Sequence, residues 1–403
     1  MDFPREEYEQ RWARVYAEMS RRGYTTLVVW QRSGGSYDRA GHLWWLASYA
    51  SQQSGQRAQR LWNEAGYAFA ALIFHDGQEP ELHINEPLEI VDRSRLPVTN
   101  VKYHDNLFFG VADRIRELRV ERVVYVGDDV LPAAHYRALI AASPGVAWVP
   151  DDPMLTGAQL VKSRLELDAF REAGEISSRA LTALMEALIQ GRPESEAAAA
   201  AAKIIVGAGG GIHRIATNHG KLSETTAWSD ALVGYTNQAP EPGDMVVGCV
   251  FGPIAKGYWV DPCRSAYCGN KPTPVQREAI ETCWEIVDVA IDAVQVGTTP
   301  REAASKVDPV ATRVGYFAEA TLQWPYYGHG LHMFFDAPYL VPLLEPGAKS
   351  TTHMVDEPFR DGQVFTAEAF LHRPGIGTAS FEEVFIITDK GNEMLCSTPR
   401  VFW

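Results

Sequence analysis

The stretch Gly-His-Gly-Leu-His-Met-Phe-Phe-Asp-Ala-Pro, residues 328–338, decides how the rest of the chain is interpreted. It follows the aromatic residues Trp324, Tyr326 and Tyr327, and its first histidine, His329, lies between two glycines. Glycine exposes backbone and adds no side chain to a core. The pattern is therefore typical of a ligand histidine rather than of a packing residue.

Three other segments place an acidic residue beside or inside an apolar, strand-like run. A buried unpaired charge costs several kcal/mol, so these acids need a common partner close to His329. A shared metal ion is the simplest such partner. The segments are Gly257 to Arg264, which contains Asp261, Gln363 to Glu368, and Ser380 to Val384, which contains Glu382 and Glu383.

Composition excludes several classes of protein. The chain has 403 residues, 46% of them hydrophobic and 11% aromatic, which is ordinary globular composition with room for about two or three domains. A formal net charge of −14 argues against a nucleic-acid or membrane-surface partner, because both favour a basic face. No apolar run approaches the roughly 20 residues that span a bilayer, and the first residues are charged. We predict a cytoplasmic protein that binds a small molecule.

The five cysteines are odd in number and show no short paired spacing. A disulfide framework is therefore not expected. They are Cys249, Cys263, Cys268, Cys283 and Cys396.

The first part of the chain alternates helical and strand-like patterns, as an α/β domain does. Apolar residues at three- and four-residue steps predict a helix over 5–22, a strand follows at 25–30, and Asp76-Gly77 predicts a hairpin turn. Residues 42–67 are rich in aromatic and polar side chains. They fit either a surface loop or a wall contributed to a neighbouring subunit. Asp151-Asp152-Pro153 predicts a boundary between domains 1–153 and 154–403.

The second part begins with long helical patterns and ends with strands. Gly207 to Gly211 is interpreted as a turn and not as a phosphate loop, because no Gly-Lys-Ser/Thr ending follows. The predicted helices cover 164–190, 194–206, 273–295 and 300–314, and the predicted strands cover 245–251, 258–261, 363–371, 380–388 and 393–396.

Five motifs in this order resemble the superfamily of aminopeptidase P, prolidase, methionine aminopeptidase and creatinase. The likeness covers residues 155–396, and the layout is nearest to creatinase-like members that are not peptidases. The motifs are Pro-Gly-Asp at 242–244, Gly-Tyr-x-x-Asp-x-x-Arg-Ser at 257–265, Gly-His-Gly at 328–330, Phe-Thr-x-Glu at 365–368 and Glu-Glu-Val-Phe-Ile-Ile-Thr at 382–388.

The resemblance implies an α+β protein in which a creatinase-type N-terminal domain precedes a pita-bread domain, a curved antiparallel sheet with helices outside. It also implies a homodimer. Carried over by position, Asp261 is a bridging ligand, His329 a ligand, Glu368 a ligand and proton acceptor, and Glu382 a second bridging ligand. Carboxylates with one imidazole suit manganese, iron, cobalt or zinc.

This chain departs from the family pattern at three places. Where the family has a further aspartate ligand, counting forward reaches Cys249 and counting back from Asp261 reaches Val250, so Cys249 is either a softer metal ligand or a small buried residue. Asp336 stands where peptidases have a second histidine, and Tyr235 near their substrate-facing histidine. We therefore expect one secure metal site rather than two.

Three functions remain open. The leading one is a metal-dependent hydrolase that cleaves a C–N bond of a small molecule, or of an Xaa-Pro-like substrate. The second is a metal-dependent lyase resembling the dimethylsulfoniopropionate lyases of this fold, with Asp336 as the base. The third is a binding protein without catalysis. Retention of four ligand positions argues against the third, because a buried acidic cluster without a cation is costly.

Overall fold

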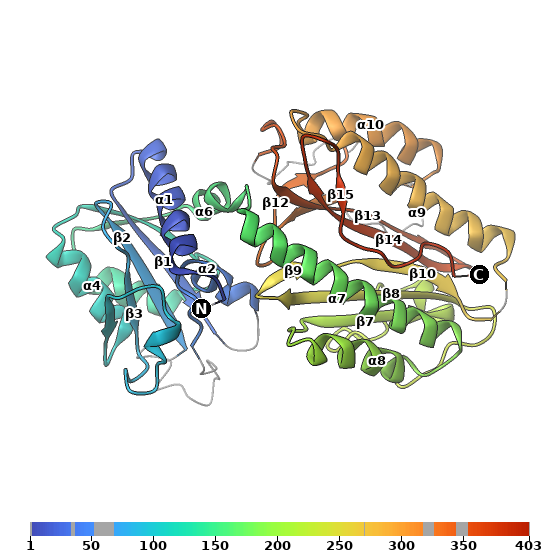
Figure 1. The fold of residues 1–403 in the computed structure, drawn as a ribbon, viewed down its shortest axis with the longest axis horizontal. Helices are drawn as coiled ribbons and strands as arrows, with labels where there is room; N and C mark the ends of the chain where they lie inside the picture. The colour runs from blue at the N-terminus through green and yellow to red at the C-terminus, as the bar shows by residue number, and fades with distance from the viewer. Residues whose placement is uncertain are drawn as a thin grey trace. The chain divides into compact units, whose positions relative to one another are not determined.

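The computed structural model describes residues 2–33, 37–51, 68–269, 271–316, 326–343 and 354–402. It forms two compact units, 1–159 and 160–403 (Figure 1). The predicted boundary at Asp151-Asp152-Pro153 lies at the start of helix α6 (Asp152–Gln159), which belongs to the first unit. No helix in the described ranges is long and apolar enough to cross a bilayer.

The first unit is a six-stranded mixed sheet with helices. Its strands follow the order β4-β3-β2-β1-β5-β6. The turn at Asp76-Gly77 joins an antiparallel pair, which confirms the predicted hairpin. The elements are α1 (Arg5–Arg22), β1 (Thr26–Arg32), α2 (Tyr37–Ala47), β2 (Phe69–His75), β3 (Glu81–Ile84), β4 (Val101–Tyr103), α4 (Leu107–Glu117), β5 (Arg122–Val126), α5 (Ala133–Ala142), β6 (Ala147–Pro150) and α6.

The second unit is built on an antiparallel sheet in the order β12-β11-β13-β14-β10-β8-β7, with β9 paired to β8 and β15 to β14. The elements are α7 (Arg164–Ile189), α8 (Glu194–Gly207), β7 (Arg214–His219), β8 (Met245–Ala255), β9 (Tyr258–Val260), β10 (Cys263–Tyr267), α9 (Pro274–Ala293), α10 (Pro300–Arg313), β11 (Gly328–Leu331), β12 (Phe335–Leu340), β13 (Gln363–Arg373), β14 (Gly377–Ile387) and β15 (Glu393–Met394).

Three long helices of this unit begin at capping boxes, which is why the sequence starts them where it does. In each box a Ser or Thr side chain accepts from the third backbone N–H, and the third residue's side chain accepts from the cap. The pairs are Ser163 with Glu166 at α7, Thr273 with Gln276 at α9 and Thr299 with Glu302 at α10.

The strands of the second unit divide their residues between two faces, because side chains alternate along a strand. Odd-numbered residues of β13 and β14, such as Phe365 and Phe381, pack in the core with α9 and α10. A Cβ at Gly248 of β8 would meet Met185 and Leu184 of α7. All these helices therefore cover one face, and the even-numbered residues of β13 and β14 face the other way.

Candidate metal centre

A row of directly opposed residues crosses four neighbouring strands on the face away from the helices. Cys249 of β8 is opposite Cys263 of β10, Cys263 is opposite Glu382 of β14, and Glu382 is opposite Glu368 of β13. Opposed residues of antiparallel strands have Cβ atoms only about 5 Å apart. Strand register alone thus gathers two acids and two cysteines.

His329 joins this row from β11, next to β13. A Cβ at Gly328 would lie 2.2 Å from the Thr366 carbonyl oxygen, and one at Gly330 would lie 2.5 Å from the Ala337 carbonyl oxygen. The two glycines therefore let β11 fit between β12 and β13.

The hydrogen bonding of His329 leaves one ring nitrogen directed at the acids. Its Nδ1 donates to the Gly330 carbonyl at 3.0 Å. The other nitrogen, Nε2, lies 3.6 Å from Asp261 Oδ2 and 3.5 Å from Glu368 Oε1. A histidine fixed in this way presents Nε2 as a ligand.

Asp261 shows that the cluster is suited to a cation. It is 1% exposed, and neither of its oxygens has a hydrogen-bond donor within the described residues. Ligand atoms of Asp261, His329 and Glu382 all lie within 4.8 Å of one another. Buried carboxylates without donors are paired or coordinate metals. The residues therefore fit a divalent ion of the manganese, iron, cobalt or zinc kind.

The electrostatics of the cluster lead to the same conclusion. Burial raises the pKa of Asp261 to about 7. Burial, together with repulsion from neighbouring carboxylates, holds the pKa of Glu368 and Glu382 well above the ordinary value. Burial also lowers the pKa of His329 to about 4, so the imidazole is neutral. A bound cation would offset the cost of ionising these three buried acids, and a neutral imidazole can act as a ligand for it.

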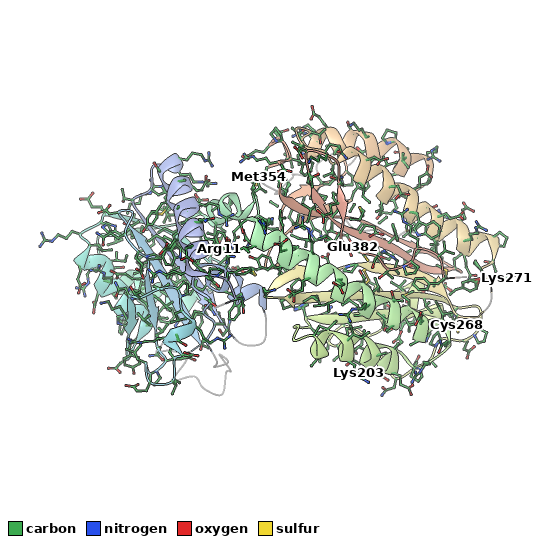
Figure 2. The ribbon with its side chains drawn as sticks, viewed as in Figure 1. Arg11, Lys203, Cys268, Lys271, Met354 and Glu382 are labelled. Carbon is green, nitrogen blue, oxygen red and sulfur yellow. A yellow bond between two sulfur atoms is a disulfide. The ribbon has the colours of Figure 1, made fainter. Side chains whose placement is uncertain are left out.

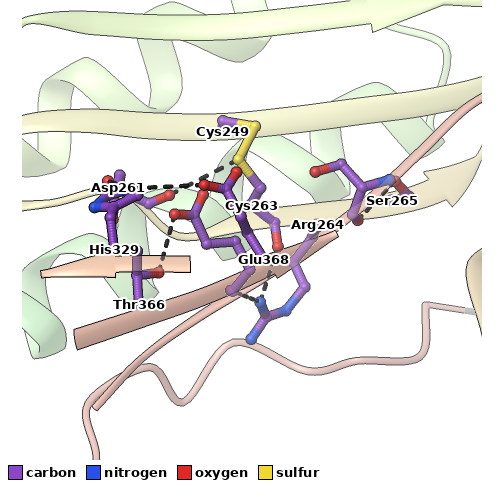
Figure 3. Close-up of a disulfide and its surroundings, with 10 residues drawn as sticks. Cys249, Asp261, Cys263, Arg264, Ser265, His329, Thr366 and Glu368 are labelled. Atoms are coloured by element: carbon purple, nitrogen blue, oxygen red, sulfur yellow. Dashed lines mark hydrogen bonds and ion pairs between the residues drawn. A yellow bond between two sulfur atoms is a disulfide. The ribbon is translucent and has the colours of Figure 1, made fainter. Parts of the chain in front are cut away.

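Neighbouring side chains hold the acids in place. The Thr366 hydroxyl donates to Glu382 Oε1 at 2.9 Å. On the helix-covered face, Arg264 binds the Glu382 carbonyl at 2.8 Å and the Glu383 carboxylate at 2.7 Å. Glu383 therefore points away from the cluster, because neighbouring side chains of a strand lie on opposite faces. Figure 3 shows Arg264 turned away from His329 and Asp261.

A cavity of about 190 Å³ opens onto the cluster. Its wall combines the acids with aromatic rings and one arginine. The lining residues are His213, Arg214, Trp228, Phe251, Trp259, Asp261, Cys263, Tyr326, His329, Phe334, Phe335, Glu368 and Glu382.

The structure brings some of the predicted site residues together and leaves others apart. Asp261, His329, Glu368 and Glu382 come together at the cavity wall. Cys249 lies in the same row, but its sulfur is bonded to Cys263, so the disulfide leaves no thiolate for a metal. The expectation that no cysteines pair was wrong, because residues 14 apart in sequence become neighbours only through the register of β8 and β10.

The remaining candidates are not part of the cavity wall. Asp336 lies on β12 opposite Gly330, and its Oδ1 accepts from the Ala337 backbone N–H. Tyr235 is half-buried and lies after the segment that carries Trp228. Neither is among the residues that line the cavity.

Sequence reasoning missed three residues of the site. Cys263 is two positions after Asp261 and Thr366 two before Glu368, so a two-residue period would have indicated both. Arg214 reaches the cavity from the start of β7, and no local pattern announces it.

A buried clamp holds the segment that carries Trp228. Glu194 Oε1 accepts from His219 Nδ1 at 2.7 Å and from the Ser229 hydroxyl at 2.6 Å, and its Oε2 accepts from the Thr236 backbone N–H at 2.8 Å. Burial opposes both charges, yet these bonds lower the pKa of Glu194 and raise the pKa of His219 overall.

The clamp predicts a pH-dependent stability. The raised pKa of His219 adds stability below about pH 6.5 that is lost as pH rises through its folded value, whereas the lowered pKa of Glu194 adds stability that is lost below about pH 4.5. His219→Asn should therefore cost about 1 kcal/mol of unfolding free energy near pH 5.5 and less at pH 9. Urea unfolding at both pH values measures this, and an equal loss at both contradicts it.

These features define a class, a pita-bread protein with a buried cluster of acids and one histidine that is suited to a metal ion. The family model for metallopeptidase family M24 matches residues 168–389. The chain belongs to this family of metal-dependent hydrolytic enzymes.

Individual proteins of known sequence or structure are also similar to this chain. The probable dipeptidase PepE of Mycobacterium tuberculosis is 27% identical over 281 residues, 68% of this chain and 68% of that protein. The solved structure of dipeptidase PepE from Mycobacterium ulcerans gives a TM-score of 0.76 at 23% identity, covering 99% of this chain and 98% of that one. The Xaa-Pro dipeptidase of Bacillus anthracis gives 0.76 at 18% identity, covering 98% and 99%. The predicted superfamily and pita-bread fold are confirmed.

Proposed function

We propose that the chain is a metal-dependent hydrolase that cleaves the peptide bond of a dipeptide, or the C–N bond of a small molecule of similar size. The observation that carries this proposal is the buried set of Asp261, His329, Glu368 and Glu382 in one wall of a small cavity. The names of the relatives, dipeptidase and Xaa-Pro dipeptidase, support the peptide bond.

The chain's own residues would share the work. The ion would be held by Asp261, His329, Glu368 and Glu382, and when bound it would acidify water and polarise a carbonyl group. Glu368, whose carboxylate lines the cavity beside Asp261 and His329, would accept a proton from the attacking water and pass it to the leaving nitrogen. The aromatic rings in the cavity wall would limit the access of bulk water to the acids.

The size of the cavity favours a small substrate. Pockets for drug-sized ligands usually measure about 300 to 1,000 Å³. A cavity of about 190 Å³ suits a dipeptide or a smaller amide rather than a longer peptide.

Arg214 adds a second preference. It is half-buried in the cavity wall, and the Asp230 carboxylate acts on it electrostatically without forming a close ion pair with it in the described part of the chain. We therefore assign it to a carboxylate on the substrate, such as the C-terminus of a dipeptide.

Arg214→Gln should lower kcat/KM for dipeptides by about 10- to 100-fold, because a charged hydrogen bond contributes about 1.5 to 3 kcal/mol. The same dipeptides with an amidated C-terminus should be cleaved equally by variant and wild type. Arg277→Gln, at an exposed arginine of α9 paired with Glu281, is the matched control. An equal loss on both substrate types would remove Arg214 from carboxylate recognition.

The function itself is tested with protein purified without chelator. Metal content is measured first, and dipeptides with and without proline are then compared with tripeptides and small amides. His329→Ala should lose metal and turnover while it keeps its fold. Product analysis separates the alternatives: a hydrolase adds one water across the bond, a lyase yields an alkene, and a binding protein yields neither.

Two expectations stay predictions. The prediction of a homodimer depends partly on residues 42–67. Of these, residues 52–67, which include Trp62, lie outside the described residues, and so does Trp324. A cytoplasmic location is likewise a prediction from the sequence.

A further inference from the structure

The Cys249–Cys263 disulfide lies beside the carboxylates of the metal centre. Cys263 is flanked in its row by Cys249 on one strand and Glu382 on the next. Cys263 is also among the residues that line the cavity, although only 3% of its surface is exposed. Figure 3 shows the disulfide next to Asp261 and Glu368.

The disulfide also belongs to a small apolar cluster. Cys249 and Cys263 pack with Ala216 and Val247, and Trp228 and Phe251 lie against them. Among the acids, Glu382 lies directly opposite Cys263, whereas the Asp261 contact to Cys263 Sγ, at 3.8 Å, is through the backbone carbonyl oxygen. After reduction, the Glu382 carboxylate is therefore the additional ligand that the strand register places beside the two sulfurs.

We propose that this disulfide is a redox gate on a second metal position. In the oxidised chain the two sulfurs are bonded to each other and bind no ion. In the reduced chain Cys249 and Cys263, together with Glu382, bind a second divalent ion of thiophilic character, such as Zn²⁺. The inference deepens the proposed function, since Glu382 serves both ions.

The gate reaction balances with a low-molecular-weight thiol. One thiol attacks the disulfide, the S–S bond breaks, and a second thiol releases the mixed disulfide. Two electrons and two protons pass to the cysteines, and two thiols leave as a disulfide. Metal binding then releases the two protons, because thiolates are the ligands.

The ligand set determines which ion would bind. Two thiolates and a carboxylate favour zinc over manganese, with sulfur to zinc distances of about 2.3 Å. The two sulfurs must then separate to about 3.7 Å for tetrahedral angles at zinc. Cys263 lines the cavity, so the movement would carry its sulfur toward that space.

The test measures zinc per chain in oxidised protein and in protein reduced anaerobically with a trialkylphosphine. The phosphine takes oxygen from water as it reduces the disulfide. It is chosen because it does not bind zinc as dithiols do. Zinc should rise from about one to about two equivalents on reduction. Cobalt-loaded protein should gain a sulfur-to-cobalt charge-transfer band only when reduced. Alkylation and mass measurement count the thiols, and circular dichroism confirms the fold.

Matched variants separate the gate from general effects of reduction. Cys249→Ser and, independently, Cys263→Ala should stay at about one equivalent in either condition. Cys268→Ser should behave like wild type, because Cys268 is a buried free cysteine that Figure 2 shows far along the sheet from Glu382.

Equal zinc content in both redox states, a gain that survives in Cys249→Ser, or a disulfide that the phosphine does not open in the folded protein would each overturn the proposal. The proposed function fails differently: oxidised protein would then bind no metal at all, whereas a gain on reduction would still support the gate.

Discussion

Asp261→Asn is expected to lower hydrolysis by about 10³-fold or more and to remove most of the bound metal. The exchange keeps the shape of the side chain but removes an anionic ligand from a site where Asp261, His329 and Glu382 converge within 4.8 Å. Metal ions contribute several kcal/mol to such reactions, and each 1.36 kcal/mol corresponds to a factor of ten in rate. Elemental analysis and initial rates measure both losses.

The same variant should not be less stable than wild type when both are metal-free. Asp261 is a buried acid whose oxygens have no donor within the described residues, so its neutral replacement removes a cost. Asp356→Asn, at an exposed acid paired with Arg301, is the control and should keep metal and activity. If Asp261→Asn keeps full metal content, the assignment of the cluster is wrong.

Arg264→Met is expected to cost about 3 to 5 kcal/mol of unfolding free energy, because it leaves the buried Glu383 carboxylate without its partner. Both side chains of this pair are almost fully buried, at 0% and 5% exposure. The guanidinium also donates to the Thr398 and Pro399 carbonyls and lies 4.5 Å from the centre of the Phe381 ring. Denaturant unfolding measures the loss.

Two comparisons make this result specific. The double variant Arg264→Met with Glu383→Gln should recover much of the loss, because the stranded charge is gone. Arg171→Met, at an arginine paired with Glu393 where both side chains are about 40% exposed, should cost no more than about 1 kcal/mol. Similar losses at Arg264 and Arg171 would contradict the role of burial.

Local patterns in the sequence predicted most of the fold. The helix predicted over 5–22 is α1 (Arg5–Arg22), and the strands predicted at 363–371 and 380–388 are β13 and β14. Hydrophobic period and capping residues act over a few neighbours, so they can be read without tertiary structure. The sequence singles out Asp261, His329, Glu368 and Glu382 because family motifs and acids in apolar strands coincide, and the structure brings these four residues together.

What escaped prediction depends on strand register. Cys249 and Cys263 are opposed only because β10 pairs with β8 in one particular alignment, and a shift by one residue would send their side chains to opposite faces. Arg214 depends in the same way on the pairing of β7 with β8. Nothing in the spacing of these residues along the chain reveals such contacts.

The alternation along β13 and β14 has an evolutionary consequence. Even-numbered positions such as Thr366, Glu368 and Glu382 belong to the chemistry, whereas odd-numbered positions such as Phe365 and Phe381 belong to the core. Selection for a new reaction and selection for a durable fold therefore act on alternate letters of the same two segments. Substitutions at the even-numbered positions can therefore change the chemistry of the site without altering the residues that form the core.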